Sequence, residues 1–585
     1  MLQLRDVTFS YDDPSGDTGD GRTLTQAPAP VLDRVDLTID DGELVVLAGP
    51  TGVGKSTLLG VVAGLVPAFS GGTLSGDVLL DGVRVTGLPA RERAHVIGYV
   101  GQNPPTWFVT DTVEEELAFG MEQLGVAPAA MRRRVEETLD VLGIADLRHR
   151  DLRTLSGGQQ QRVAIGCVLT THPRLLVLDE PTSALDPTAA EDVLATLTRL
   201  VQDLGVSVLV AEHRLERVLP FADQLCVLGA DPLRGGRLIT GAPAEVLPHA
   251  PVAPPLVELG RLAGWDPLPL TVRDARRAAA TLRPRLGPPP HPVTPTAASP
   301  APASPIPNTP AGEAPPSVSV RRLVVAHGRH PVLREVSFDL RPGTVTALMG
   351  RNGAGKSTLL WTLQGRHTPA SGTVRVAGSE PSALSTAQRR AHTGLVPQSP
   401  ADLLYLETVA QECAAADASA DAPAGTCADL LERLAPGIAP DHHPRDLSEG
   451  QRLALAVAIV LTARPPVLLL DEPTRGLDYP AKRALAAILR ELAAGNGTGA
   501  ADPPRTVLLA THDVEFVAQV ADELLMLAEG EIVSAAPVAQ ALTESPAFAP
   551  QVTKVLGPGW LTVADVAAAL ARGAVERGAV EQGLR

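Results

Sequence analysis

Two stretches of the chain combine residue types and spacing suited to binding phosphate. GPTGVGKST begins at Gly49 and GRNGAGKST begins at Gly350. Each has the pattern G-x-x-x-x-G-K-S between an apolar run that predicts a strand and a segment that predicts a helix. Glycines allow the backbone N–H groups to face an anion, and the positive end of the helix dipole adds to that attraction. The sequence therefore predicts two phosphate-binding loops (P-loops).

Several side chains of these loops have expected roles toward ATP. Lys55 and Lys356 would reach the β- and γ-phosphates, and the hydroxyls of Ser56 and Ser357 would ligate Mg²⁺. The expected ATP contacts are Gly49, Gly52, Gly54, Lys55, Ser56 and Thr57 in the first loop, and Gly350, Gly353, Gly355, Lys356, Ser357 and Thr358 in the second.

Two acidic pairs follow apolar runs downstream of the loops. LLVLDE ends in Asp179 and Glu180, and VLLLDE ends in Asp471 and Glu472. An aspartate at the end of a buried strand can hold Mg²⁺, directly or through water. The glutamate beside it can polarise the water that attacks the γ-phosphate. Glu180 and Glu472 are therefore the predicted catalytic carboxylates.

These elements recur in the same order along the chain, which indicates a duplicated domain. Short apolar runs alternate with helical patterns in each copy. Continuously apolar strands separated by helices predict a largely parallel sheet covered on both faces. Examples of the predicted strands are Leu44–Ala48, Leu175–Leu178, Val206–Val210 and Val467–Leu470.

The sequence divides into five predicted regions. They are a first domain (1–250), a helical appendix (251–283), a linker rich in Pro, Ala, Ser and Thr (284–316), a second domain (317–545) and a C-terminal helical tail (546–585). The linker composition cannot bury enough apolar surface to fold. Insertions at 12–30 and 495–504 are predicted surface loops.

Bulk composition excludes several classes of protein. The net charge of −16 over 585 residues argues against nucleic acid as a partner, since phosphate backbones are normally bound by basic surfaces. We expect no signal peptide and no transmembrane segment, because no apolar run is long enough to cross a bilayer. None of the four cysteines forms a CxxC pair, so we expect small buried side chains without a metal or redox role.

Further motifs make the chain resemble the ATP-binding cassette (ABC) ATPases. LSGGQQQR at Leu155–Arg162 and LSEGQ at Leu447–Gln451 resemble the family's signature. Gln102 in VGQNP and Gln398 in VPQSP match its Q-loop. His213 and His512 follow later strands, as the family's histidines do. The strands that end in Asp179 and Asp471 match the family's Walker B motif, and Leu-Asp pairs follow them at 185–186 and 477–478.

The resemblance implies an α/β fold with two P-loop ABC nucleotide-binding domains. Each would have a mainly parallel sheet with flanking helices, a helical signature subdomain and an antiparallel β subdomain. It also implies that each ATP lies between one domain's P-loop and the other domain's signature, and that His213 and His512 are catalytic. The resemblance implies further ATP contacts at Gln102 and Gln398, which would also approach Mg²⁺ together with Asp179 and Asp471. The remaining implied ATP contacts are the signature residues Ser156, Gly157, Gly158, Gln159, Ser448, Gly450 and Gln451.

The two sites are not identical in sequence. Tyr11 stands where family members stack an aromatic ring on adenine, and His327 takes that place in the second copy. Glu449 replaces a signature glycine, and its charge would repel the γ-phosphate unless the side chain points outward. We expect both sites to hydrolyse ATP at unequal rates.

The segment QNPPTWFVTDTVEEELAFG resembles the ATPases of energy-coupling-factor (ECF) importers, in particular the fused form with both domains in one chain. That resemblance implies membrane-embedded T-type and S-type subunits, a peripheral place on the cytoplasmic face of the membrane, and a vitamin, vitamin precursor or transition-metal ion as cargo. The alternatives are the tandem ATPase of a sugar or peptide importer, whose fused forms often have one damaged P-loop, and a soluble ABC translation factor, whose linker is typically a charged helical arm.

Overall fold

The computed structural model describes residues 1–11, 30–183, 185–229, 236–292, 315–495, 503–544 and 548–583, with side chains up to residue 573. The chain forms two compact units, Met1–Thr271 and Val272–Arg585. Most of the linker predicted at 284–316 lies outside the described residues, as do most of the insertions predicted at 12–30 and 495–504.

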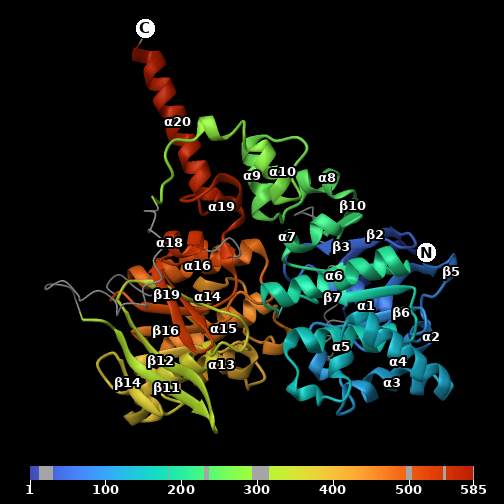
Figure 1. The fold of residues 1–585 in the computed structure, drawn as a ribbon, viewed down its shortest axis with the longest axis horizontal. Helices are drawn as coiled ribbons and strands as arrows, with labels where there is room; N and C mark the ends of the chain where they lie inside the picture. Colours follow the sequence, from blue (N-terminus) through green and yellow to red (C-terminus); the bar gives the residue numbers. More distant parts are fainter. Residues whose placement is uncertain are drawn as a thin grey trace, which may run out of the picture. The chain divides into compact units, whose positions relative to one another are not determined.

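The first unit contains two sheets (Figure 1). Its strands are β1 (Leu2–Ser10), β2 (Leu32–Ile39), β3 (Leu44–Ala48), β4 (Thr73–Leu80), β5 (Val83–Arg84), β6 (Ile97–Val100), β7 (Leu175–Asp179), β8 (Ser207–Ala211), β9 (Gln224–Leu228) and β10 (Leu238–Gly241). Its α-helices are α1 (Lys55–Ala63), α2 (Ala90–Arg93), α3 (Val113–Gln123), α4 (Pro128–Leu142), α5 (Gly157–Leu169), α6 (Pro187–Leu204), α7 (Leu215–Val218), α8 (Pro243–Val246) and α9 (Pro255–Ala263).

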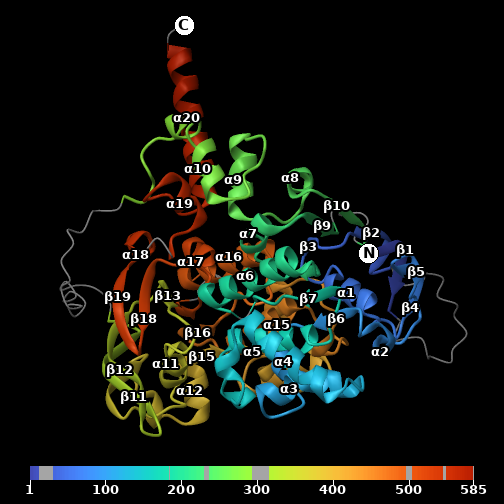
Figure 2. The same cartoon turned by 45° about the vertical axis from the view of Figure 1, so that its right-hand side comes forward.

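The second unit repeats this plan, as the orange and yellow elements of Figure 2 show. Its strands are β11 (Val318–His327), β12 (His330–Leu340), β13 (Val345–Met349), β14 (Ser371–Val376), β15 (Thr393–Val396), β16 (Val467–Asp471), β17 (Thr506–Ala510), β18 (Glu523–Ala528) and β19 (Glu531–Pro537). Its α-helices are α10 (Val272–Ala278), α11 (Lys356–Leu363), α12 (Thr386–His392), α13 (Val409–Ser419), α14 (Thr426–Leu434), α15 (Glu449–Thr462), α16 (Tyr479–Ala494), α17 (Val514–Val520), α18 (Val538–Glu544), α19 (Gln551–Leu556) and α20 (Val563–Gly583).

The larger sheet of each unit is parallel except at one edge, as the sequence predicts. The strand orders are β10-β9-β3-β8-β7-β6 and β15-β16-β17-β13-β18-β19, and only the β10–β9 and β18–β19 pairs are antiparallel. Side chains of a strand alternate between the two faces. Val177 points to the face that carries α1, while Leu176 and Leu178 point to the opposite face, and all three are fully buried. Both faces of this sheet are therefore covered.

The carboxyl ends of the central strands meet at one edge of each large sheet. In the first unit, Leu47 of β3 and Asp179 of β7 are both register partners of Ala211 in β8. The P-loop follows β3, the acidic pair ends β7, and His213 follows β8. Parallel pairing thus brings together three motifs that are far apart in the sequence.

The remaining elements form two smaller parts in each unit. The antiparallel sheets are β2-β1-β4-β5 and β12-β11-β14. Three helices pack on one another beside each large sheet: α3, α4 and α5 in the first unit, and α13, α14 and α15 in the second. These helical subdomains carry the signature sequences. None of the described helices is both long and apolar enough to cross a membrane.

The predicted helical appendix at 251–283 is divided between the units. Helix α9 belongs to the first unit, whereas α10 packs against α19 of the second. The Arg276 guanidinium donates a hydrogen bond to the carbonyl of Lys554 at 2.6 Å, and Arg283 donates one to Val555 at 2.7 Å. The region predicted as a C-terminal tail contains α19 and α20, so its first helix serves as the docking site for α10.

Candidate functional site

The two P-loops wrap around their own lysines. Lys55 Nζ donates hydrogen bonds to the carbonyls of Gly49 at 2.9 Å and Pro50 at 3.1 Å. Lys356 Nζ donates to Gly350 at 2.8 Å and to Arg351 at 3.3 Å. Both lysines are buried, so each ammonium group is held inside the curve of its loop.

Close backbone contacts explain why glycines open each loop. A Cβ atom on Gly49 would lie 2.5 Å from the carbonyl oxygen of Leu228, and one on Gly350 would lie 2.3 Å from that of Leu527. The N-cap glycines of the following helices, Gly54 and Gly355, have φ of 107° and 105°. Side chains are disfavoured in that region of φ, so the loop shape depends on glycine.

The catalytic glutamates predicted from the sequence sit in an unusual backbone conformation. Glu180 has φ of 50° and Glu472 has φ of 48°, a left-handed region that non-glycine residues seldom occupy. Each is held there by the neighbouring strand, since the backbone N–H of Glu180 donates to Ala211 and that of Glu472 donates to Ala510. Strain of this kind persists where the surrounding structure fixes it and is frequent at functional sites.

Each glutamate lies against the predicted histidine of its own unit. His213 Nε2 is 2.8 Å from Glu180 Oε1, and His512 Nδ1 is 2.9 Å from Glu472 Oε2. All four side chains are buried. In the second unit, Lys356 Nζ also lies 3.7 Å from Glu472 Oε1. The structure thus joins residues from three sequence motifs into one buried cluster.

The donor set beside each P-loop fits a magnesium ion. Asp179 accepts a hydrogen bond from Ser56, and Asp471 accepts one from Ser357. The other carboxylate oxygen of each aspartate, Oδ1, is buried and has no hydrogen-bond partner among the described residues. Burial and the adjacent Glu180 raise the pKa of Asp179 to about 6, which shows that its charge lacks full compensation. Hydroxyl and carboxylate oxygens are ligands that Mg²⁺ prefers.

The two Q-loop glutamines differ in their surroundings. Gln102 Nε2 donates a hydrogen bond to Glu180 Oε1 at 3.1 Å, so the first Q-loop contacts the cluster of Glu180 and His213. Gln398 follows β15, and both glutamines are exposed, so the two differ in this contact and not in burial. The sequence alone predicts the same place for both residues.

Both signature sequences form the start of a helix. Ser156 is the N-cap of α5 and Ser448 is the N-cap of α15, each with a complete capping box. The side chains of Gln159 and Gln451 close these boxes by accepting from the backbone N–H groups of the serines, at 2.9 and 3.0 Å. The glutamines therefore fix the helix start. In the first turn of α5, Gly157 is exposed and Gly158 is buried, and Gly450 is half-buried in the first turn of α15.

The acidic residue of the second signature is paired within its own helix. Glu449 Oε1 lies 3.0 Å from the Arg452 guanidinium. The matching residues of the first unit are Gly157 and Gln160, so both members of this pair are changes specific to the second signature. The ion pair offsets part of the charge that would repel a phosphate.

The two predicted adenine-stacking residues lie in different settings. The Tyr11 hydroxyl is 3.0 Å from Thr57 Oγ1 in the P-loop helix, and the residue is 42% exposed. His327 is exposed, and its ring meets that of His367 edge to face with 5.4 Å between the ring centres. Only Tyr11 is tied directly to its P-loop helix.

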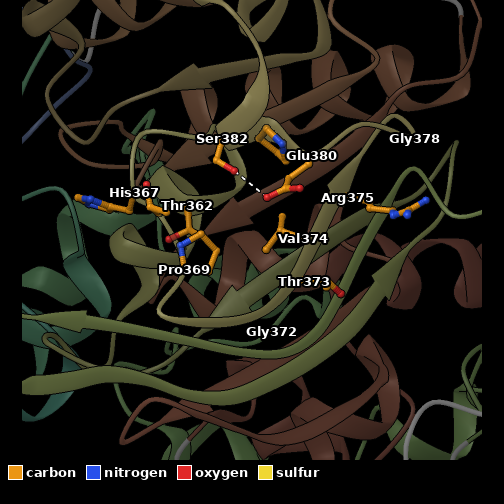
Figure 3. A pocket seen from close by; sticks show the side chains of 12 residues that line it. Thr362, His367, Pro369, Gly372, Thr373, Val374, Arg375, Gly378, Glu380 and Ser382 are labelled. Carbon is orange, nitrogen blue, oxygen red and sulfur yellow. Dashed lines mark hydrogen bonds between the residues drawn. The ribbon is translucent and has the colours of Figure 1, made fainter.

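His367 also lines a cavity of about 320 Å³ in the second unit (Figure 3). Thr362 of α11 lies beside His367 at one wall, and Glu380 accepts a hydrogen bond from Ser382 at another, at 3.0 Å. None of the P-loop residues and none of the residues of the acidic pairs lines this cavity.

Two sets of buried charges were not predicted from the sequence. Glu116 of α3 accepts hydrogen bonds from the backbone of Val109 and Thr110, and Glu412 of α13 accepts them from Tyr405 and Leu406. In both copies the sequence has a glutamate four residues after a threonine that caps a helix, and this repeated spacing could have pointed to the two buried glutamates.

The second set is an ion pair confined to the second copy. Lys482 Nζ of α16 lies 2.7 Å from Asp513 Oδ2, both buried, directly after His512. The sequence places Lys482 at helical spacing from Leu485 and Leu489, on the apolar face of its helix, and this pattern could have predicted a buried lysine.

Comparison with known proteins agrees with this geometry. The family model for ABC transporters matches residues 32–183 and 333–475. An ABC transporter ATP-binding protein of Streptomyces coelicolor is 55% identical over 586 residues, which cover 97% of this chain and 100% of the relative. Another, from Methanosarcina mazei, is 32% identical over 556 residues, covering 92% of this chain and 89% of the relative.

A solved structure of cbiO1 from Clostridium perfringens, described as part of the ABC transporter complex cbiONQ, is 28% identical to the chain. It covers 42% of this chain and 90% of that chain, with a TM-score of 0.36. The duplicated sheet edges with their P-loops, and the two family matches that span them, lead to one conclusion: the chain belongs to the ABC transporter family, as an ATPase with two ATP-binding cassette domains.

Proposed function

We propose that the chain is the energy-coupling ATPase of a membrane importer of the ECF type. The observation that carries this proposal is the segment after the first Q-loop. Its TVEEELAFG sequence forms the start of α3. Glu116 within it holds the preceding loop, because its carboxylate accepts hydrogen bonds from the backbone N–H groups of Val109 and Thr110 and from the Thr110 hydroxyl. The loop exposes Trp107 and Val109, with 61% and 64% of their surfaces accessible.

The chemical roles of the clustered residues follow from their positions. Lys55 and Lys356 bind the β- and γ-phosphates of ATP, and the exposed N–H groups of Gly52 and Gly353 face the same anion. Ser56 with Asp179, and Ser357 with Asp471, hold Mg²⁺, which when bound neutralises charge that develops on the transferred phosphoryl group. Tyr11 stacks on adenine beside the first P-loop.

Water attack depends on the glutamate and histidine of each cluster. Glu180 and Glu472 accept a hydrogen bond from the attacking water and polarise it. His213 and His512, at 2.8 and 2.9 Å from these carboxylates, fix their orientation. Gln102 donates a further hydrogen bond to Glu180 and links this cluster to the loop that bears Trp107.

The two domains work as a pair in this proposal. The N–H groups at the starts of α5 and α15 form a second cradle for phosphate, because a helix N-terminus attracts anions. Each signature then completes the site of the other domain, so the γ-phosphate favours the closed pair and its loss favours opening. Fusion in one chain raises the effective concentration of each domain for the other.

Changing Arg452 to Gln tests the contribution of the second signature. The change removes the cation that pairs with Glu449 at 3.0 Å, so the glutamate charge would act more strongly on the γ-phosphate. We expect weaker ATP binding at the site formed by the first P-loop, by about 0.5–1 kcal/mol, as for a partly exposed ion pair. Equilibrium binding of ATP measures this effect.

The double change Arg452→Gln with Glu449→Gly serves as the control, because it restores the residue types of the first signature. ATP affinity should return to the original value or exceed it. Equal affinities in all three proteins would contradict a phosphate-facing role for this signature.

Trp107 is the proposed contact with the membrane subunit. We expect Trp107→Ala to reduce recovery of the membrane partner several-fold, because a large exposed aromatic side chain often dominates an interface. ATP hydrolysis by the isolated chain should stay unchanged. Phe69→Ala is the matched control, since Phe69 is also an exposed aromatic residue of the first unit, at 81% accessible surface.

Affinity isolation of the full chain from gently solubilised native membranes, followed by mass spectrometry, tests the whole proposal. Recovery of one helical T-type protein and a small integral S-type protein supports it, and the S-type protein then directs assays for a vitamin, vitamin precursor or metal ion. Recovery of a sugar or peptide permease would favour the alternative importer. Recovery of ribosomal proteins alone would leave only the ATPase activity standing.

A further inference from the structure

Two cysteines that are apart in the sequence meet inside the helical subdomain of the second unit. Cys413 lies on α13 and Cys427 lies near the start of α14, and these two helices pack against each other (Figure 1). Both thiols are free, and both side chains belong to the same buried apolar core of this unit. The sequence predicted no redox role for them because their spacing in the chain gives no sign of this contact.

The first unit has aliphatic residues at the positions that match the two cysteines. Aligned on the threonine N-caps of α3 and α13 and on the two signatures, Cys413 matches Leu117, and Cys427 matches Val135. Leu117 is fully buried and Val135 nearly so. The second unit therefore has two thiols at positions that hold buried aliphatic side chains in the first unit.

The smaller side chains of the second unit leave space. A cavity of about 580 Å³ lies between α13 and α14, and Cys413 lines it, as do several alanines of both helices. Cys427 is not part of the cavity lining and is fully buried. A small polar molecule can therefore reach Cys413 first, with Cys427 as its immediate neighbour.

Asp417 fixes the relative position of the two helices. Its carboxylate accepts hydrogen bonds from the backbone N–H groups of Cys427 at 2.8 Å and Gly425 at 2.7 Å. Asp417 lies one turn after Cys413 on α13, so the same face of α13 carries the thiol and the clamp. This arrangement holds Cys427 against Cys413.

The two thiols differ in character. The hydrogen bond from the Cys427 thiol lowers the pKa of Cys413 below its usual value, whereas the same bond and burial raise that of Cys427. A lower pKa increases the thiolate fraction, and the thiolate is the nucleophile. Burial raises the pKa values of Cys167 and Cys226, which makes them internal controls.

From the Asp417 hydrogen bonds that hold Cys427 beside the Cys413 face of α13, and from the cavity that Cys413 lines, we propose that Cys413 and Cys427 are a modification site for peroxide, which oxidises them to a disulfide joining α13 to α14. The Cys413 thiolate attacks one oxygen of hydrogen peroxide, the O–O bond breaks, and hydroxide leaves and takes up a proton. The resulting sulfenic acid is attacked by the Cys427 sulfur, which displaces a second hydroxide. Two thiols and one peroxide become one disulfide and two waters.

The experiment uses the full folded chain treated with graded hydrogen peroxide. Free thiols are blocked with maleimide after denaturation, oxidised thiols are reduced and labelled with a heavy maleimide, and peptides are mapped by mass spectrometry. We expect heavy label on Cys413 and Cys427 in equal amounts at peroxide doses that leave Cys226 unlabelled. The proposal would be overturned if the heavy label on this pair stays at background, or if it reaches all four cysteines at the same peroxide dose.

Single variants assign the order of reaction. Cys427→Ser should accumulate a Cys413 sulfenic acid that dimedone traps, whereas Cys413→Ser should leave Cys427 unreactive. A dimedone adduct on Cys427 in place of Cys413 would overturn the assignment of Cys413 as the attacking thiol. The double change Cys413→Leu with Cys427→Val, which installs the residues of the first unit, should fold and yield no disulfide at any dose.

Discussion

Replacing Glu180 and Glu472 together by Gln is expected to lower kcat for ATP hydrolysis by about a hundredfold to ten-thousandfold, the usual contribution of a general base. Glutamine has nearly the shape of glutamate but cannot polarise water as a carboxylate does. ATP binding should persist because the lysines and serines of both P-loops remain. Phosphate release and equilibrium ATP binding, measured on the same preparation, separate the two effects.

Glu529→Gln is the matched control for that variant. Glu529 is exposed and also has a left-handed backbone, with φ of 50°. If the loss of hydrolysis came from placing glutamine in this conformation, Glu529→Gln would show a comparable loss of stability. We expect no change in hydrolysis and little change in Tm.

The single variants distinguish the two sites. In the proposed pairing, Glu180→Gln leaves the site that combines Lys356 with the intact first signature, whereas Glu472→Gln leaves the site that combines Lys55 with the signature containing Glu449. We expect higher residual hydrolysis in Glu180→Gln, because its remaining site lacks an acidic side chain near the γ-phosphate. Equal residual rates would contradict the predicted asymmetry.

Replacing either P-loop lysine is expected to weaken ATP binding more than it affects other steps. Lys55→Met and Lys356→Met each remove a buried ammonium group whose partners are loop carbonyls at 2.8–3.3 Å. Loss of a buried charged contact with phosphate should cost about 2 kcal/mol or more, which is about thirtyfold or more in Kd. Titration with a fluorescent ATP analogue at constant salt measures the change.

Lys356→Met should also reduce hydrolysis beyond its effect on binding, since Lys356 Nζ lies 3.7 Å from Glu472 Oε1. Lys554→Met is the control, because that lysine lies on α19, far from both P-loops in the sequence. Unchanged ATP affinity in Lys55→Met and Lys356→Met would contradict the phosphate-binding role of both loops.

Local patterns account for what the sequence could predict. The P-loops, the acidic pairs and the buried strands each carry their signal within about ten residues, and the strand predicted at 175–178 is β7 almost unchanged. Helix starts at Ser156 and Ser448 follow from capping residues that are visible in the sequence. Such features depend little on distant contacts.

Features that depend on tertiary contacts could not be predicted in this way. The left-handed conformation of Glu180 is imposed by a hydrogen bond to Ala211 on the next strand. The contact of Cys413 with Cys427 needs the packing of two helices, and the split of the appendix at 251–283 depends on where α10 docks. Gln102 and Gln398 share a sequence motif, yet only Gln102 has a hydrogen bond to its glutamate in the described structure.

Photolabelling with azido-ATP tests most directly the central claim that the two domains act as one two-site ATPase. The chain with both Glu180→Gln and Glu472→Gln is labelled alone and with Ser156→Arg, and the labelled peptides are mapped. If each signature completes the other domain's site, Ser156→Arg removes label from the second domain, near His327, and spares the first, near Tyr11. Loss of label from the first domain only, or no loss from either, would contradict the account.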